Sequence, residues 1–126
     1  MKVIHIPYER TLPCTVHDVS QDTDCCLDEI KKLIGIEWAE IVVTIIKAPD
    51  PHRDYCLIVD EVGKLKEGWT SRINERASRF YAGSYHGDPI VGDVVLCARE
   101  WSPEYGECDL TGLCKVEEDV LLHQLL

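Results

Sequence analysis

The chain has 126 residues, 45% of them hydrophobic and 29% charged, which argues against a disordered protein and favours one domain with its own core. The formal net charge of −10 argues against broad binding to nucleic acids or anionic membranes, because phosphate groups repel an acidic surface. No apolar run approaches the roughly 20 residues of a membrane span, and residues 1–10 lack the apolar core of a signal peptide, so we expect a cytoplasmic protein.

The first 35 residues predict a strand followed by a helix. Residues 2–6 alternate in polarity as a strand does, and the stretch between Pro7 and Pro13 is expected to be extended or looped. From residue 26 onward, apolar side chains recur at helical spacing up to Gly35, the natural residue to follow a helix end. The candidates for the N-cap of this helix are Asp22, Thr23 and Asp24.

The rest of the chain predicts further strands and two helices. The expected elements are strands over residues 36–47, 55–60, 64–69 and 90–98, and helices over residues 71–81 and 116–126. The first of these strands is almost continuously apolar, which is typical of a strand covered on both faces. The last helix could pack on its own sheet, or against a second copy or another partner, through an apolar side formed by Val116, Val120, Leu121 and Leu125.

This order of elements predicts an α+β domain. A β-α-β-β-α-β succession fits an antiparallel sheet with two helices on one face, either ferredoxin-like or more irregular, followed by a C-terminal helix. We therefore expect an α+β domain over residues 1–113 and a helical extension over residues 114–126.

Motifs for metal binding, phosphate binding and catalysis are missing from the sequence. The seven cysteines are odd in number and form no C-x-x-C pair, so we interpret them as reduced, small apolar residues rather than metal ligands. Neither a glycine-rich phosphate loop nor a G-x-S-x-G elbow occurs. We expect no cofactor, no metal and no catalytic residues, and an enzyme is the less favoured class.

The segment over residues 64–79 is basic in an otherwise acidic chain, with five basic residues and two acidic ones. Within the expected helix, three arginines recur at helical spacing, and two hydroxyl residues lie at its N-terminus, where backbone N–H groups favour an anion. The candidate residues for binding a ligand or partner are Trp69, Thr70, Ser71, Arg72, Arg76, Arg79 and Tyr81. Three roles remain open for the arginines: pairing with carboxylates of the same chain, binding an anionic ligand, or contacting a protein or second subunit.

Three stretches resemble the DUF3846 family of small proteins from phages, plasmids and gut Firmicutes. They are the run from Tyr55 to Trp69 with its Glu-Val-Gly-Lys-Leu turn, the segment Asn74-Glu-Arg-Ala77, and the run Asp-Pro-Ile-Val-Gly-Asp-Val-Val-Leu that ends at Leu96. Leu27 to Glu37 is also similar to a family element, although the single Gly35 replaces a glycine pair. The resemblance implies the fold of residues 1–113 and a mobile-element origin, and it carries no catalytic residues.

These observations lead to two functional expectations besides an enzyme. The first is a non-enzymatic phage or mobile-element protein that presents acidic surface to a basic site on a host protein, as an inhibitor of restriction, CRISPR or signalling-based defence would. The second is a sponge that captures a small anionic nucleotide at the arginines, with a homo-oligomer left open. Direct nucleic-acid binding and membrane association are not expected.

Overall fold

Strand β5 (Val94–Ser102) is the centre of an antiparallel sheet because it pairs with three other strands. The computed structural model describes residues 1–22, 25–104 and 106–126. Within these ranges the sheet has six strands in the order β2-β1-β5-β4-β3, with β6 also paired to β5. The other strands are β1 (Lys2–Ile6), β2 (Thr15–Asp18), β3 (Ala39–Lys47), β4 (Arg53–Asp60) and β6 (Glu107–Thr111).

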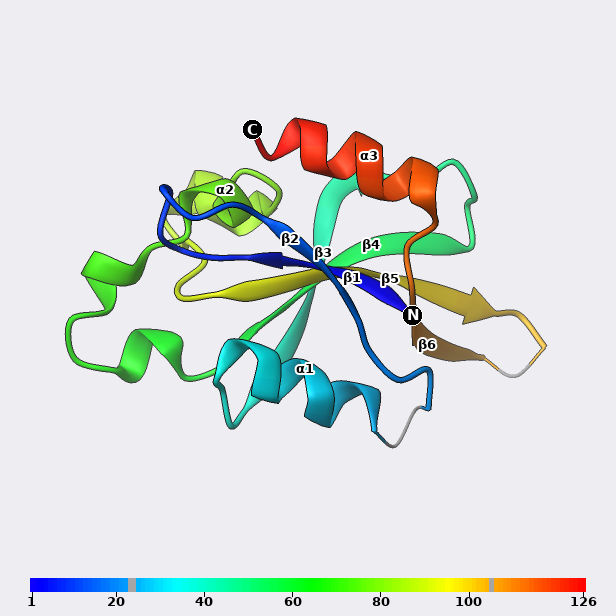
Figure 1. Cartoon of the computed structure of the whole chain (residues 1–126), viewed down its shortest axis with the longest axis horizontal. Helices are drawn as coiled ribbons and strands as arrows, with labels where there is room; N and C mark the ends of the chain where they lie inside the picture. Colours follow the sequence, from blue (N-terminus) through cyan, green and yellow to red (C-terminus); the bar gives the residue numbers. More distant parts are fainter. Residues whose placement is uncertain (23–24, 105) are drawn as a thin grey trace.

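The helices cover both faces of this sheet. Figure 1 shows α1 (Cys26–Ile34) on one face, and α2 (Glu75–Ser78) and α3 (Lys115–Gln124) on the other. Short 3-10 turns lie between β4 and β5, at η1 (Gly63–Leu65), η2 (Trp69–Arg72) and η3 (Ala82–His86). Among the helices of the described ranges, none has the length and apolar character needed to cross a membrane.

Alternation along the central strands divides the core into two layers, because successive strand side chains point to opposite faces. On β4, Leu57 packs toward α2 and α3, whereas its neighbour Ile58 packs toward α1. The larger layer also contains Phe80 next to α2, and Leu121 and Leu125 on or after α3. The sheet is therefore buried on both faces at its centre.

The predicted α+β class and antiparallel sheet are confirmed, and the sheet is of the irregular kind rather than ferredoxin-like. A split βαβ unit needs two parallel strands with one strand between them. Here β1 and β3 are separated by β5 and β4, and the successive antiparallel pairings make β1 and β3 run in opposite directions. The expectation that the first two helices share one face was wrong, since α1 and α2 lie on opposite faces.

Helix α1 forms where the sequence predicts it. Gly35 follows its last turn in the left-handed conformation, with φ of 69°, and donates its N–H to the carbonyl of Lys31. A residue without Cβ adopts this conformation at little cost. The N-cap position is occupied by Cys25 and not by the predicted Asp22. The main-chain carbonyl of Asp22 accepts the N–H of Cys26, the first residue of α1. The other two cap candidates, Thr23 and Asp24, lie outside the described residues.

The second predicted helix, over residues 71–81, is broken by a buried asparagine. Asn74 is fully buried and donates from its side-chain nitrogen to the carbonyls of Ile6 and Gly92, each at 2.9 Å. Its side-chain oxygen accepts the N–H of Ala77 and caps α2. Because Asn74 is held to the sheet in an extended conformation, the helix starts only after it and has a single turn.

Several predicted strands differ from those in the structure. Residues 64–69 form turns rather than a strand, and the last core strand spans 94–102 rather than 90–98. Strands β2 and β6, which the sequence did not predict, extend the sheet by pairing with β1 and β5. Strand β3 lies at the edge of the sheet, and the expectation that both of its faces are covered was wrong, because Ile41, Val43 and Ile45 are exposed.

The C-terminal helix packs on its own sheet, through a narrower apolar side than expected. Leu121 and Leu125 are buried in the larger core layer, whereas Val116 and Val120 are 71% and 51% exposed. The buried side of α3 is completed by Glu117, so part of its docking surface is polar.

Replacing Asn74 with Ala should lower the free energy of unfolding by about 3 kcal/mol, because the buried Ile6 carbonyl, the partly buried Gly92 carbonyl and the Ala77 N–H lose their partner. Urea unfolding followed by circular dichroism measures the loss. Asn74→Asp keeps the cap oxygen but turns a carboxylate toward two carbonyls, so it should be at least as destabilising at neutral pH. Ser71→Ala, on the exposed side of η2, is the control and should change stability by less than about 0.5 kcal/mol. A loss below about 1 kcal/mol in both Asn74 variants would contradict the anchoring role.

Candidate functional site

A groove of about 770 Å³ opens where three segments distant in sequence meet. The connection between β1 and β2, helix α2 and the C-terminal end of α3 lie together on one face of the sheet in Figure 1. The residues lining the groove are Arg10, Thr11, Leu12, Pro13, Cys14, Glu75, Arg76, Arg79, Leu122, Leu125 and Leu126. Two of the predicted binding residues, Arg76 and Arg79, therefore belong to one concave site.

The groove is basic because, within the described residues, Arg10 alone of its three arginines forms an ion pair with a carboxylate. Arg10 pairs with Glu75 at 2.8 Å. Arg76 donates to the carbonyls of Pro7 and Glu9, at 2.8 and 3.0 Å, and its buried Nε finds no hydrogen-bond acceptor in the described part of the chain. The exposed Arg79 has no ion pair with any carboxylate of the described residues. Arg76 is thus held rigidly, and Arg79 is free to meet a ligand.

The rest of the lining is aliphatic. Leu125 is buried and Leu122 is half-buried, so they form the floor, whereas Leu12 is 51% and Leu126 is 91% exposed at the rim. No aromatic side chain lines this groove. Apolar surface beside guanidinium groups suits a ligand with an anionic head and an aliphatic portion.

Among the described lining residues, the one cysteine is Cys14, whose thiol is a candidate nucleophile. Burial raises the pKa of its thiol, and the charge of Arg76 only partly opposes this. A thiol in this state is mostly protonated near neutral pH and therefore a weak nucleophile. The groove favours binding over covalent chemistry.

The other predicted site residues lie elsewhere. Arg72 lines a separate, smaller hollow with Lys66 and Asp93, and its guanidinium is 3.4 Å from the carbonyl of Glu67. Trp69, Thr70 and Ser71 belong to η2, and Tyr81 donates its hydroxyl to Asp88 at 3.3 Å. The expectation of three arginines on one helical face was wrong, because Asn74 ends the continuity between η2 and α2.

The partners of Arg72, Arg76 and Arg79 bear on the three roles expected for these arginines. In the described part of the chain, none of the three forms an ion pair with a carboxylate; Arg72 and Arg76 contact main-chain carbonyls instead. Pairing within the chain therefore does not account for their charge. Arg10, which the sequence did not single out, is brought beside two of them by the β1–β2 connection.

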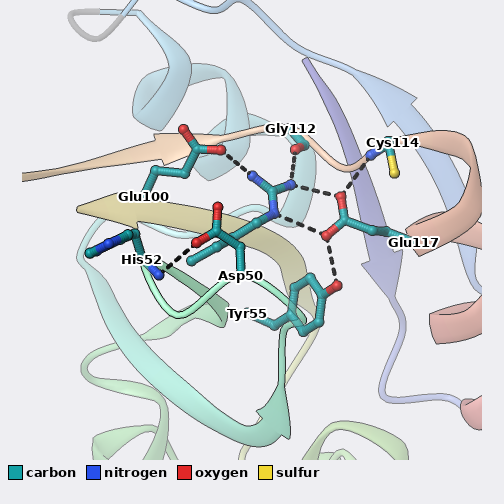
Figure 2. A network of polar contacts seen from close by, with 8 residues as sticks. Asp50, His52, Tyr55, Glu100, Gly112, Cys114 and Glu117 are labelled. Atoms are coloured by element: carbon teal, nitrogen blue, oxygen red, sulfur yellow. Dashed lines mark hydrogen bonds and ion pairs between the residues drawn. The ribbon is translucent and has the colours of Figure 1, made fainter. Parts of the chain in front are cut away.

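The most extensive polar cluster is centred on Arg53 of β4 (Figure 2). Its guanidinium donates two hydrogen bonds to Glu117 of α3, at 2.7 and 3.0 Å, and one to Glu100 of β5 at 2.6 Å. A fourth hydrogen bond, of 2.7 Å, reaches the carbonyl of Gly112, just after β6. Glu117 also accepts the Tyr55 hydroxyl at 2.6 Å and the Cys114 N–H at 3.0 Å.

The Arg53 cluster is a structural clamp rather than a reactive site, since its groups are already satisfied. Burial alone would raise the pKa of Glu117, but hydrogen bonds from Arg53, the Cys114 N–H and Tyr55 outweigh it and lower the pKa to about 2. Burial, together with the hydrogen bond to Glu117, raises the pKa of Tyr55 to about 12. Both groups keep one protonation state over the physiological range, unlike an acid or base that must exchange protons.

The cysteines are all free thiols. Cys56 and Cys97 face each other across β4 and β5, with sulfurs 3.6 Å apart and fully buried in the layer under α1. The described residues contain no cluster of three or more His, Cys, Asp or Glu side chains that could hold a metal ion.

A scan against protein-family models, a search of curated proteins and a search of solved structures found no match to this chain, so the resemblance to the DUF3846 family stays a prediction.

The substitution Glu117→Gln should lower the free energy of unfolding by about 2–3 kcal/mol, because Arg53 loses a bidentate carboxylate while remaining largely buried. Chemical unfolding at pH 7 measures this. Asp119→Asn, which removes an exposed carboxylate from the same helix, is the matched control and should cost less than about 1 kcal/mol. Equal effects of the two substitutions would contradict the clamp.

The same carboxylate should make stability depend on pH in the acid range. The folded pKa of Glu117, about 2, lies below its ordinary value of 4.5. Its contribution is therefore complete above about pH 4.5 and is lost as the pH falls toward 2. In unfolding experiments from pH 7 to 2, the stability difference between wild type and Glu117→Gln should shrink over this window. A difference that stays constant across it would contradict the lowered pKa.

Proposed function

We propose that this protein is a non-enzymatic binding protein that takes a small anionic ligand with an aliphatic portion into the groove of Arg10, Arg76 and Arg79. The observation that carries the proposal is the absence of carboxylate partners for Arg76 and Arg79 among the described residues, beside a leucine floor. In a chain of net charge −10, acids to neutralise them are abundant. Charge left unpaired in a concave site favours a ligand that supplies the missing anion.

Arg76 and Arg79 would contribute to ligand binding in different ways. Arg76 is fixed by the Pro7 and Glu9 carbonyls and so presents a pre-organised charge at the groove wall. Pre-organisation reduces the entropy that binding would otherwise cost. Arg79 is exposed and unpaired within the described residues, so it can close on a carboxylate or phosphate from the solvent side.

An aliphatic anion fits the lining better than the nucleotide expected from the sequence. Nucleobases are usually held by stacking on aromatic side chains or on guanidinium planes. The described lining of the groove offers no aromatic side chain, and Arg76 is engaged with carbonyls, so stacking would depend on the exposed Arg79. Leu12, Leu122 and Leu125 would instead cover a short alkyl chain.

Recognition of a basic host protein, as expected of a defence antagonist, is the second candidate, and the net charge of −10 favours it. Its acidic surface would have to come from carboxylates that are not already neutralised. Many lie within ion-pair distance of a cation of the same chain, including Asp18, Asp54, Asp60, Asp88, Glu100, Glu117 and Asp119. The groove is therefore the better-supported site.

Decanoate, used below its micelle concentration, should raise the melting temperature of the wild-type protein. A ligand at about 100 times its Kd stabilises by about 2.7 kcal/mol. Arg79→Glu should raise the Kd for decanoate at least tenfold, since it replaces an attractive charge with a repulsive one. Isothermal calorimetry gives the two Kd values.

Two controls separate the groove from non-specific binding of a charged alkyl chain. Arg72→Ala removes an arginine outside the groove and should leave the Kd for decanoate unchanged. Decanol, which has the same chain without the charge, should bind at least tenfold more weakly than decanoate. No stabilisation by decanoate, or equal Kd values for wild type and Arg79→Glu, would contradict the proposal.

A further inference from the structure

Strand β3 exposes an apolar ladder at the edge of the sheet. Ile41, Val43 and Ile45 are 41%, 43% and 47% exposed, although the same face of β4 and β5 is buried under α1. Ala39, at the start of β3, packs against the core layer under α1, whereas Ile41, Val43 and Ile45 do not belong to that layer. Trp38, just before β3, is 60% exposed. Ile41, Val43 and Ile45 therefore form an apolar ladder that the described chain leaves partly uncovered.

The edge itself is also open to pairing. β3 ends the strand order of the described residues, so within them no strand pairs with its outer side. Natural edge strands are usually protected by proline, by several charged residues or by a covering segment. Strand β3 has no proline, and its two charged residues, Glu40 and Lys47, lie near its two ends. The protection of this edge is partial: a register shift follows Val43, and Ile45 donates its N–H to the Phe80 carbonyl at 2.8 Å. The half of the strand from Ala39 to Val43 is regular.

We propose that β3 pairs with β3 of a second copy, antiparallel and about a twofold axis near Val43, so that two sheets join into one. A twofold axis perpendicular to the sheet keeps the α1 face of both copies on the same side. The isoleucines and valine of the two ladders then become neighbours on that face, where β-branched cross-strand pairs are favourable. One surface serves both partners, as in an isologous dimer.

The charges at the two ends of β3 favour a second copy in this orientation. The strand begins beside Glu37 and Glu40 and ends at Lys47. Antiparallel pairing brings Lys47 of each copy to the acidic end of the other, whereas parallel pairing would place like charges together. This complementarity offsets part of the repulsion between two chains of net charge −10.

Sedimentation of the full chain over a range of concentrations tests the proposal. The wild type should form a species of twice the 14.3 kDa chain mass. Val43→Lys, which places two lysines near the twofold axis, should raise the dimer Kd at least tenfold. Val116→Lys adds the same charge at an exposed valine on α3 and should leave the dimer Kd unchanged. Far-UV circular dichroism verifies that both variants fold.

A charge exchange distinguishes strand pairing from a general effect of charge. Glu40→Lys and Lys47→Glu should each weaken the dimer, and the double variant should restore it, since the ends are then complementary in the opposite sense. A monomeric wild type at every concentration, or a Val43→Lys dimer as tight as the wild type, would overturn the proposal. If the wild type is monomeric at every concentration, the edge of β3 would instead suit pairing with an extended segment of another protein. Decanoate binding in the groove does not depend on either outcome.

Discussion

The bidentate contact between Arg53 and Glu117 is the interaction on which the rest of the architecture depends. Arg53 lies on β4, and its other partners are on β5 and just after β6, so one guanidinium joins three strands to α3. The contact fixes where the last helix begins, and the helix then carries Leu121 and Leu125 into the core. Since Leu122, Leu125 and Leu126 also line the groove, a buried ion pair at one end of α3 positions the ligand surface at the other.

Asn74 has the corresponding role on the other wall of the groove. It ties the start of α2 to β1 through the Ile6 carbonyl and to the segment before β5 through the Gly92 carbonyl. Arg76 follows two residues later and reaches back to the chain that leaves β1. The groove is thus assembled by side-chain hydrogen bonds to main-chain carbonyls, and α2 needs no length of its own to hold its arginines in place.

The parts of this structure that the sequence predicts are those determined by local signals. The helical spacing before Gly35 and the apolar run of β4 were sufficient for α1 and β4. The break at Asn74 depends on carbonyls far away in the chain, and an asparagine within a helical pattern gives no indication of them. The expectation that both faces of β3 are covered failed for another reason: a run of β-branched residues has the same sequence pattern whether a helix covers the strand or leaves it exposed. Arg53 and Glu117 could not be distinguished from other charged residues, whereas Arg76 and Arg79 could, because basic residues cluster in their segment.

The facing sulfurs of Cys56 and Cys97 give the molecule an internal reporter of its own opening. Both lie at 0% exposure beneath α1, so a thiol reagent can reach them only after that helix has left the sheet. Cys25, Cys108 and Cys114 are exposed and would be labelled at once. Once the half-buried Cys14 and the buried Cys26 are replaced with Ser, the slow phase of alkylation would time the detachment of α1 while α3 remains clamped on the opposite face.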